Sequence, residues 1–268
     1  MPDELIHADP WQQLRRFTGA RIGLGRSGDS LPTGAMLAFQ LDHARARDAV
    51  HLPFEAGRLA EELAAEGYTV LVVQSAADDR ATYLRRPDFG RHLSPSGRAT
   101  LEAYTASHGA GYDAAFVIAD GLSSLAVHRH AVPLLTRAIA ALNGLGWRVA
   151  PVVVASQGRV ALGDDIGELL GAEQVAVLIG ERPGLTAADS LGVYLTYGPR
   201  PGRTDAERNC ISNIHGQGQS YEAALTTLLF LMSEARRRRL TGVDLKDDRA
   251  ELGSPDGGGD TPLLQDGA

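Results

Sequence analysis

Five short apolar runs, several of them rich in valine, alternate along the chain with segments whose apolar residues are spaced as in helices. Runs of this length are typical of strands that are buried on both faces of a sheet. Their alternation with helices predicts an α/β fold with a mainly parallel, Rossmann-like sheet and helices on both of its faces. The expected strands cover residues 69–74, 114–119, 148–155, 175–179 and 192–197.

The other segments divide the chain into three expected parts. Residues 1–50 form an N-terminal extension of helices and a glycine-rich loop, which we expect to pack on the sheet domain. Residues 51–247 form the α/β domain itself. Residues 248–268 are rich in Gly, Asp and Pro and poor in large apolar side chains, which is typical of a disordered tail. The expected helices cover residues 11–17, 37–50, 55–66, 78–85, 95–107, 131–143, 164–170 and 220–239.

Composition excludes several classes of function. The net charge of −7 disfavours nucleic acid as the main partner, because phosphate binding needs a basic surface. A single cysteine cannot form an internal disulfide, which fits a reducing compartment. No run approaches the roughly 20 apolar residues of a membrane span, and the N-terminus lacks the basic and apolar regions of a secretion signal. The sequence therefore predicts a cytoplasmic protein without membrane contact.

Candidate ligand-binding residues follow the fourth apolar run. That run ends in Gly180-Glu181-Arg182-Pro183-Gly184, where glycine and proline turn the chain sharply. Ligands of open parallel sheets bind outside the carboxyl ends of the strands, so Glu181 and Arg182 are expected to face a crevice. Residues 198–208 are polar and turn-rich, and the only cysteine, Cys210, comes shortly after them. Composition and periodicity alone predict an α/β domain with a ligand crevice and specify no reaction.

A second candidate site is the loop that contains Gly23, Gly25 and Gly28, which fits the dinucleotide fingerprint G-x-G-x-x-G. Asp48 lies at about the expected distance of ~20 residues further on. The fingerprint requires a buried strand before the first glycine and a helix that opens at the loop. Only a very short apolar segment precedes Gly23, and Pro32 follows soon after the loop. This context disfavours a nicotinamide-dependent oxidoreductase, which stays as an alternative.

Asp120, Ser123, Ser124, His128 and His130 include the residue types of a hydrolase triad. Their sequence does not contain the G-x-S-x-G turn that exposes a nucleophilic serine. A helix start capped by Ser or Asp, with solvated or locally bonded histidines, is the favoured interpretation.

Asp42, His43 and His51 could in principle bind a metal, but their spacing matches no zinc pattern. A salt-bridged helix surface, or a face that docks another subunit, is favoured for them.

The strings LGDDIGELLG and ADGLSS, together with residues 175–215, resemble the small (light) subunit of ethanolamine ammonia-lyase, and the similarity extends over residues 14–247. The resemblance implies an adenosylcobalamin-dependent carbon–nitrogen lyase that converts ethanolamine to acetaldehyde and ammonia. It also implies an obligate large subunit, a barrel that binds ethanolamine and guides the radical chemistry, in an assembly with six copies of each subunit. This chain is then expected to be inactive alone and to form part of the cobalamin cleft.

The same resemblance implies three cofactor-binding residues: Val160 in GRVALGD, Glu181 in LIGERPG and Cys210 in the C-I-S-N run. Glu181 would accept charge-assisted hydrogen bonds from the rim of the cofactor, unless it forms a salt bridge with Arg182 or Arg203. Val160 would offer an apolar wall or a backbone amide, and Cys210 a small, soft contact.

No catalytic residue and no metal ligand is implied in this chain. The motif Asp-x-His-x-x-Gly, with which some proteins replace the lower base of cobalamin by a histidine, is absent. Its absence fits cobalamin bound base-on. A non-catalytic α/β interaction module is a further alternative. Some relatives are packaged in a bacterial microcompartment, and the short segment before Trp11 leaves that location open.

Overall fold

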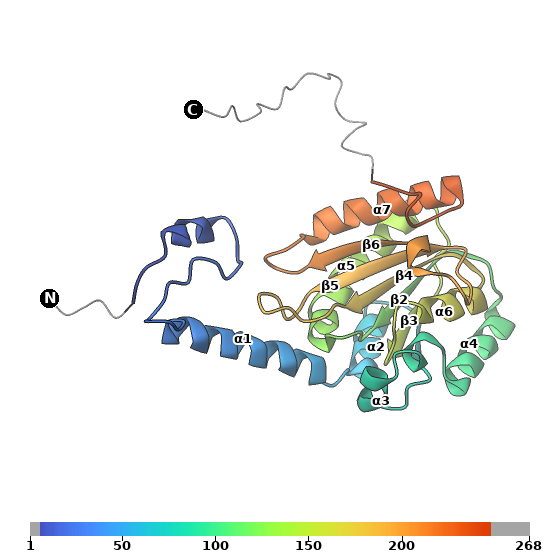
Figure 1. Ribbon diagram of the computed structural model, residues 1–268. Helices are drawn as coiled ribbons and strands as arrows, with labels where there is room; N and C mark the ends of the chain where they lie inside the picture. Colours follow the sequence, from blue (N-terminus) through green and yellow to red (C-terminus); the bar gives the residue numbers. More distant parts are fainter. Residues whose placement is uncertain (1–5, 248–268) are drawn as a thin grey trace, which may run out of the picture.

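A six-stranded sheet forms the centre of the computed structural model, which describes residues 6–247 (Figure 1). The spatial order of the strands is β1-β3-β2-β4-β5-β6. The first four strands in this order are parallel, whereas β5 is antiparallel to β4 and β6 is antiparallel to β5. The strands are β1 (Val70–Gln74), β2 (Tyr112–Ala119), β3 (Val152–Ser156), β4 (Ala172–Gly180), β5 (Leu191–Tyr197) and β6 (Arg208–Ile214).

The mixed sheet corrects part of the predicted fold class. The α/β class and the four parallel strands are confirmed, but the fifth predicted strand runs antiparallel and the sixth was not predicted. The connection from β4 to β5 holds no helix, and parallel neighbours need a longer crossover, so β5 turns straight back. The strand order also differs from the 3-2-1-4-5-6 order of a Rossmann sheet, so a Rossmann-like arrangement is not established.

Helices cover both faces of the sheet because side chains alternate along each strand. In β2, Phe116 and Ile118 join the core beneath α2, α5 and α7, whereas Ala115 and Val117 join the core beneath α4 and α6. The α-helices are α1 (Thr33–His51), α2 (Ala56–Ala65), α3 (Arg80–Arg85), α4 (Pro95–His108), α5 (Ser124–Gly144), α6 (Leu162–Leu170) and α7 (Tyr221–Arg238). The short 3-10 helices are η1 (Pro10–Arg16), η2 (Phe89–Arg91) and η3 (Asp205–Glu207). No helix within residues 6–247 has the length and apolar character needed to cross a membrane.

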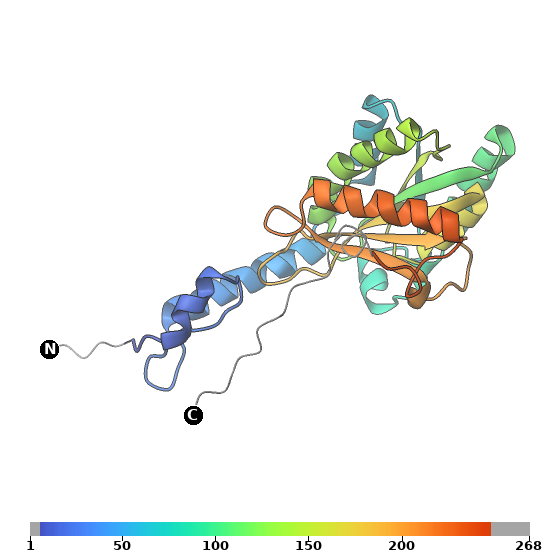
Figure 2. The same ribbon diagram turned by 90° about the horizontal axis from the view of Figure 1, so that it is seen from above.

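Residues 6–52 form an arm that projects from this body (Figures 1 and 2). The expected packing of the extension on the sheet domain is limited to the C-terminal end of α1 and to a long contact from Arg21 Nη2 to the Leu185 carbonyl, 3.5 Å. Within residues 6–247, ten of the fourteen large apolar side chains that are exposed belong to this arm. They are Ile6, Trp11, Leu14, Phe17, Leu31, Met36, Leu37, Phe39, Leu41 and Leu52. The arm therefore has almost no core of its own.

A buried ion pair joins the antiparallel edge of the sheet to α6. Arg208, at the start of β6, donates from Nη1 and Nη2 to the two carboxylate oxygens of Asp164 at 2.8 and 2.7 Å. Both side chains are only 2% exposed, and Arg208 also donates to Thr196 Oγ1 at 2.8 Å. Asp164 lies in the first turn of α6, where an acidic side chain also suits the helix dipole. The structure gives Asp164 a specific, two-bonded partner 44 residues away.

We expect Arg208→Leu to lower the free energy of unfolding by about 3–5 kcal/mol, because Asp164 would remain buried without a counter-ion. Replacing both partners, Asp164→Leu with Arg208→Leu, should recover most of that loss, since two apolar groups leave no buried charge. Urea denaturation measures both effects, and Arg200→Leu, at an exposed position, is the control. Equal losses in the single and double variants would contradict this role of the ion pair.

Candidate functional site

The loops at the carboxyl ends of β2, β3 and β4 surround a hollow of about 460 Å³. Val160, from the loop after β3, and Glu181, immediately after β4, both line it, together with Tyr83 of α3 and Tyr194 of β5. The crevice expected beside Glu181 therefore exists, and two of the three candidate residues share it. Because β5 begins at this edge of the sheet, the antiparallel strands extend one wall of the hollow.

Two glycines allow the backbone to close one side of this hollow. A Cβ on Gly121 would lie 2.2 Å from the carbonyl oxygen of Gly180, and a Cβ on Gly180 would lie 2.1 Å from that of Ser123. Gly121 also has a φ of +56°, and the amide of Leu122 donates to the Gly180 carbonyl at 2.9 Å. The turn after β2 thus crosses directly over the end of β4, at a distance that only glycine permits.

One carboxylate oxygen of Glu181 is held by the protein and the other is not. Ser190 Oγ donates to Oε2 at 2.5 Å, and the backbone amide of Asn213, on β6, donates to the same oxygen at 3.1 Å. Among the described residues, Oε1 has no hydrogen-bond partner and Glu181 forms no ion pair with Arg182 or Arg203. Arg203 pairs with Glu207 instead. Glu181 is therefore oriented by its neighbours and keeps one oxygen available to accept a bond from a ligand.

Val160 lies in the turn between β3 and α6 with its side chain partly buried against the core beneath α6. Its carbonyl accepts a bond from the amide of Gly163 at 3.0 Å. None of the hydrogen bonds between described residues uses the Val160 amide. An apolar wall and an available amide, the two roles expected for this residue, are thus both compatible with the local geometry.

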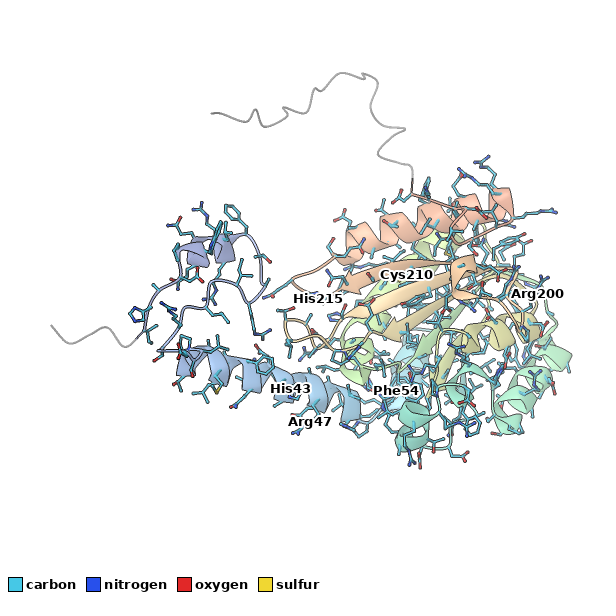
Figure 3. All side chains as sticks on the ribbon, viewed as in Figure 1. His43, Arg47, Phe54, Arg200, Cys210 and His215 are labelled. Carbon is cyan, nitrogen blue, oxygen red and sulfur yellow. The ribbon has the colours of Figure 1, made fainter. Side chains whose placement is uncertain are left out.

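Cys210 lies on the edge strand β6 and is exposed (Figure 3). It pairs in register with Tyr194 of β5, which lines the hollow, so the thiol lies beside the hollow and not among its lining residues. Loss of solvation on its inner side raises the pKa of the Cys210 thiol, the nearby Glu181 charge raises it further, and a hydrogen bond with Tyr194 opposes both. Cys210 therefore stays a neutral thiol at physiological pH.

Tyr83 and Arg159 belong to this site and were not expected from the sequence. The Tyr83 side chain is fully buried, and its hydroxyl donates to the Gly158 carbonyl at 3.2 Å. The Arg159 guanidinium lies over the Tyr83 ring, 4.2 Å from its centroid. Arg159 directly precedes Val160 in the GRVALGD motif, so this motif could have indicated Arg159 as a site residue. Tyr83 is contributed by a distant helix and has no such signal.

The segment that contains the residue types of a hydrolase triad forms the start of a helix, which is the interpretation favoured from the sequence. Ser123 is the N-cap of α5 and accepts a bond from the amide of Ala126 at 3.2 Å, while its own hydroxyl donates to the Ala188 carbonyl. His130 bonds to the Tyr221 hydroxyl at 2.7 Å, and His128 accepts from the amide of Glu55. These partners leave no serine–histidine pair arranged for nucleophilic attack.

The candidate metal residues Asp42, His43 and His51 and the glycine-rich loop all belong to the arm. Asp42 pairs with Arg21, and His43 stacks on Phe39 with 6.1 Å between ring centroids. Within residues 6–247 no group of three or more His, Cys, Asp or Glu side chains is arranged to hold a metal.

A Cβ on Gly25 would lie 2.6 Å from the His7 carbonyl, so this glycine allows the arm to fold back on itself. From residue 6 onward no strand precedes the glycine loop, so the described part of the chain does not show the context of a dinucleotide site.

Asp120 is buried at the carboxyl end of β2 with a side chain only 1% exposed. Its Oδ1 accepts from the amide of Gly158 at 2.9 Å, and its Oδ2 accepts from Arg80 Nη1 at 3.2 Å. Burial raises the pKa of Asp120 to about 6, although the Arg80 charge and the Gly158 amide act in the opposite direction. The group is a carboxylate at neutral pH whose charge has little contact with water.

The raised pKa of Asp120 predicts a pH dependence of stability. Because the folded protein binds this proton more tightly than the unfolded chain, raising the pH from about 4 to about 6 should lower the free energy of unfolding by up to ~3 kcal/mol. Asp120→Asn lacks this titration. Its stability relative to wild type should therefore improve over that pH range in urea denaturation, and a constant or opposite difference would contradict a desolvated carboxylate.

Comparison with known proteins identifies the family of this chain. The family described as ethanolamine ammonia-lyase light chain matches residues 8–246. The ethanolamine ammonia-lyase small subunit of Azotobacter vinelandii is 58% identical over 254 residues, which cover 95% of this chain and 94% of the relative. The small subunit of Pseudomonas syringae pv. tomato is 54% identical over 246 residues, with 92% and 86% covered. That of Ralstonia nicotianae is 54% identical over 242 residues, with 90% of each chain covered. These similarities confirm the resemblance drawn from the motifs: the chain belongs to the ethanolamine ammonia-lyase light-chain family.

Proposed function

We propose that this chain is the small subunit of an adenosylcobalamin-dependent ethanolamine ammonia-lyase, which converts ethanolamine to acetaldehyde and ammonia. In this proposal the chain forms one wall of the cobalamin cleft, and a large subunit binds ethanolamine. The observation that carries the proposal is the carboxylate of Glu181. It is fixed by Ser190 and Asn213 and leaves Oε1 available beside Val160 at the carboxyl edge of the sheet.

The hollow is suited to part of a large, amide-rimmed cofactor. Its walls combine apolar surface from Val160 and Leu122 with the acceptor oxygen of Glu181. Amide groups on the rim of the corrin are hydrogen-bond donors, and a carboxylate forms stronger, charge-assisted bonds with such groups. The hollow is open on one side, so a second subunit must cover the remaining surface of the cofactor. Cys210, neutral and exposed beside Tyr194, would add a soft contact.

The residues of this chain would bind and orient the cofactor and exclude water from it. When bound, adenosylcobalamin supplies an organic radical through cleavage of its cobalt–carbon bond. Glu181 would fix the rotation of the corrin within the cleft by holding a rim amide. Val160 would exclude water from one face. We assign no catalytic group and no cobalt ligand to this chain, and we propose that cobalamin is bound base-on.

The arm supports an obligate partner. Met36, Leu37, Phe39 and Leu41 are exposed on different sides of α1, and a helix that is apolar on several sides is normally buried. A second hollow, of about 570 Å³, lies between the arm and the loop that contains Leu185, which continues from Glu181.

The arm and the cofactor hollow are therefore parts of one surface, and we propose that the large subunit covers both. The chain alone would then be inactive. We further propose that the assembly contains six copies of each subunit. We propose a cytoplasmic location for it, with or without a microcompartment.

The proposal is tested by co-expressing the chain with its large subunit and comparing Glu181→Ala with wild type. Loss of a charge-assisted hydrogen bond of about 1.5–3 kcal/mol should raise the dissociation constant for adenosylcobalamin roughly 10- to 100-fold. The kcat for acetaldehyde formation at saturating cofactor should change little. Equilibrium dialysis measures the first quantity and an acetaldehyde assay the second. Glu173→Ala, at the opposite end of β4, is the matched control and should change neither.

Three results would contradict the proposal. Unchanged cobalamin affinity in Glu181→Ala would exclude this cleft as the cofactor site. Activity of the pair without cobalamin, or activity of this chain alone, would exclude the assigned role and restore the nicotinamide alternative.

A further inference from the structure

One side chain connects the arm to the proposed cofactor cleft. Arg80, the first residue of α3, donates from Nε to the carbonyl of Val50 at 2.9 Å, in the last turn of α1. From Nη1 it donates to Asp120 Oδ2 at 3.2 Å and to the Gly121 carbonyl at 2.8 Å. The arm helix and the turn after β2 thus share a single guanidinium group that is only 19% exposed.

Side chains that contact Arg80 also hold the loop that carries Val160. Asp120 Oδ1 accepts from the amide of Gly158, and the Tyr83 hydroxyl donates to the carbonyl of Gly158. A Cβ on Gly158 would lie 2.9 Å from the Cβ of Ala119, so the absence of a side chain allows the loop to lie this close to β2. Both polar atoms of this residue, two positions before Val160, are fixed by side chains that contact Arg80.

Tyr83 completes the connection between the two segments. Its ring contacts two guanidinium groups, with Arg80 at 4.8 Å and Arg159 at 4.2 Å from the centroid. Arg159 Nη2 in turn donates to the Tyr83 carbonyl at 3.2 Å. The end of α1 and the Val160 loop are therefore joined by a continuous set of buried hydrogen bonds and ring contacts.

We propose that Arg80 and Asp120 are positioning residues that couple the orientation of the arm to the geometry of the cofactor cleft. This inference rests on the proposed function, because it assigns the role of preparing the Gly158–Val160 backbone for cobalamin when the large subunit binds the arm. A guanidinium is a rigid, planar fork, so its three acceptors cannot move independently. Lysine carries the same charge on a flexible stem and cannot hold all three acceptors in that geometry.

The test uses Arg80→Lys in the co-expressed complex, with Arg85→Lys, the same exchange at an exposed position of the same helix, as control. Binding of cyanocobalamin is measured by equilibrium dialysis, and backbone mobility by hydrogen exchange of peptides that cover residues 48–52 and 157–161. In Arg80→Lys we expect roughly tenfold weaker cyanocobalamin binding and faster exchange in both peptides. We expect kcat at saturating adenosylcobalamin to stay within about twofold of wild type. The control should match wild type in every measurement.

Asp120→Asn provides a second variant, because it keeps the shape of the side chain and removes the charge that Arg80 contacts. It should accelerate exchange in the same two peptides. Faster exchange in only one of them, or unchanged cobalamin binding with both accelerated, would overturn the coupling. Loss of folding in both variants would also overturn it, since a positioning residue should alter the cleft without removing the fold. If the wild-type complex itself fails to bind cobalamin, the proposed function fails, while the paired change in hydrogen exchange still decides the coupling.

Discussion

The buried pair of Asp164 and Arg208 is the interaction on which the site depends most. It joins α6, which begins just after Val160, to β6, which carries Cys210 and the Asn213 amide that holds Glu181. Burying two charges costs desolvation energy that their attraction repays only with good geometry, so such a pair contributes little to net stability. We interpret it as a device that fixes the position of β6 relative to α6. The elements that carry the three candidate cofactor contacts are thereby fixed in position relative to one another.

The mixed sheet explains why the hollow forms at this edge. Parallel strands place their carboxyl ends together, and the loops after β2, β3 and β4 diverge from there. The antiparallel pair then adds Tyr194 to one wall, and the Asn213 amide on β6 holds Glu181. Close contact between Gly121 and Gly180 closes the other side at backbone level. A one-sided, partly apolar hollow with one oriented carboxylate is suited to a cofactor that is shared between two subunits.

Much of this arrangement could be predicted from the sequence. The apolar runs located five strands to within a few residues, and the strand-end rule placed Glu181 in a crevice before any family resemblance was considered. The antiparallel direction of β5 was also accessible, because no helix pattern separates it from β4. Strand β6 was missed because its exposed positions are polar and only Arg208, Ile211 and Ile214 are buried. The start of α5 was placed too late because His128, Arg129 and His130 interrupt its apolar pattern.

The contacts that organise the site were not accessible from the sequence. Arg80 and Tyr83 lie on α3, whereas Asp120 is 40 residues from Arg80, so their contact depends on how α3 packs against the end of β2. The Asp164–Arg208 pair is also long-range, because its two residues are 44 positions apart and no local pattern links them. Helix and strand positions follow from local patterns, whereas the arrangement of buried polar groups follows from the tertiary fold.

The most direct test of the central claim is an experimental structure of this chain in complex with its large subunit and cyanocobalamin. The account predicts a corrin amide within about 3 Å of Glu181 Oε1, Val160 against the macrocycle, and the arm covered by the large subunit. A cofactor enclosed entirely by the large subunit, with Glu181 facing solvent, would contradict it.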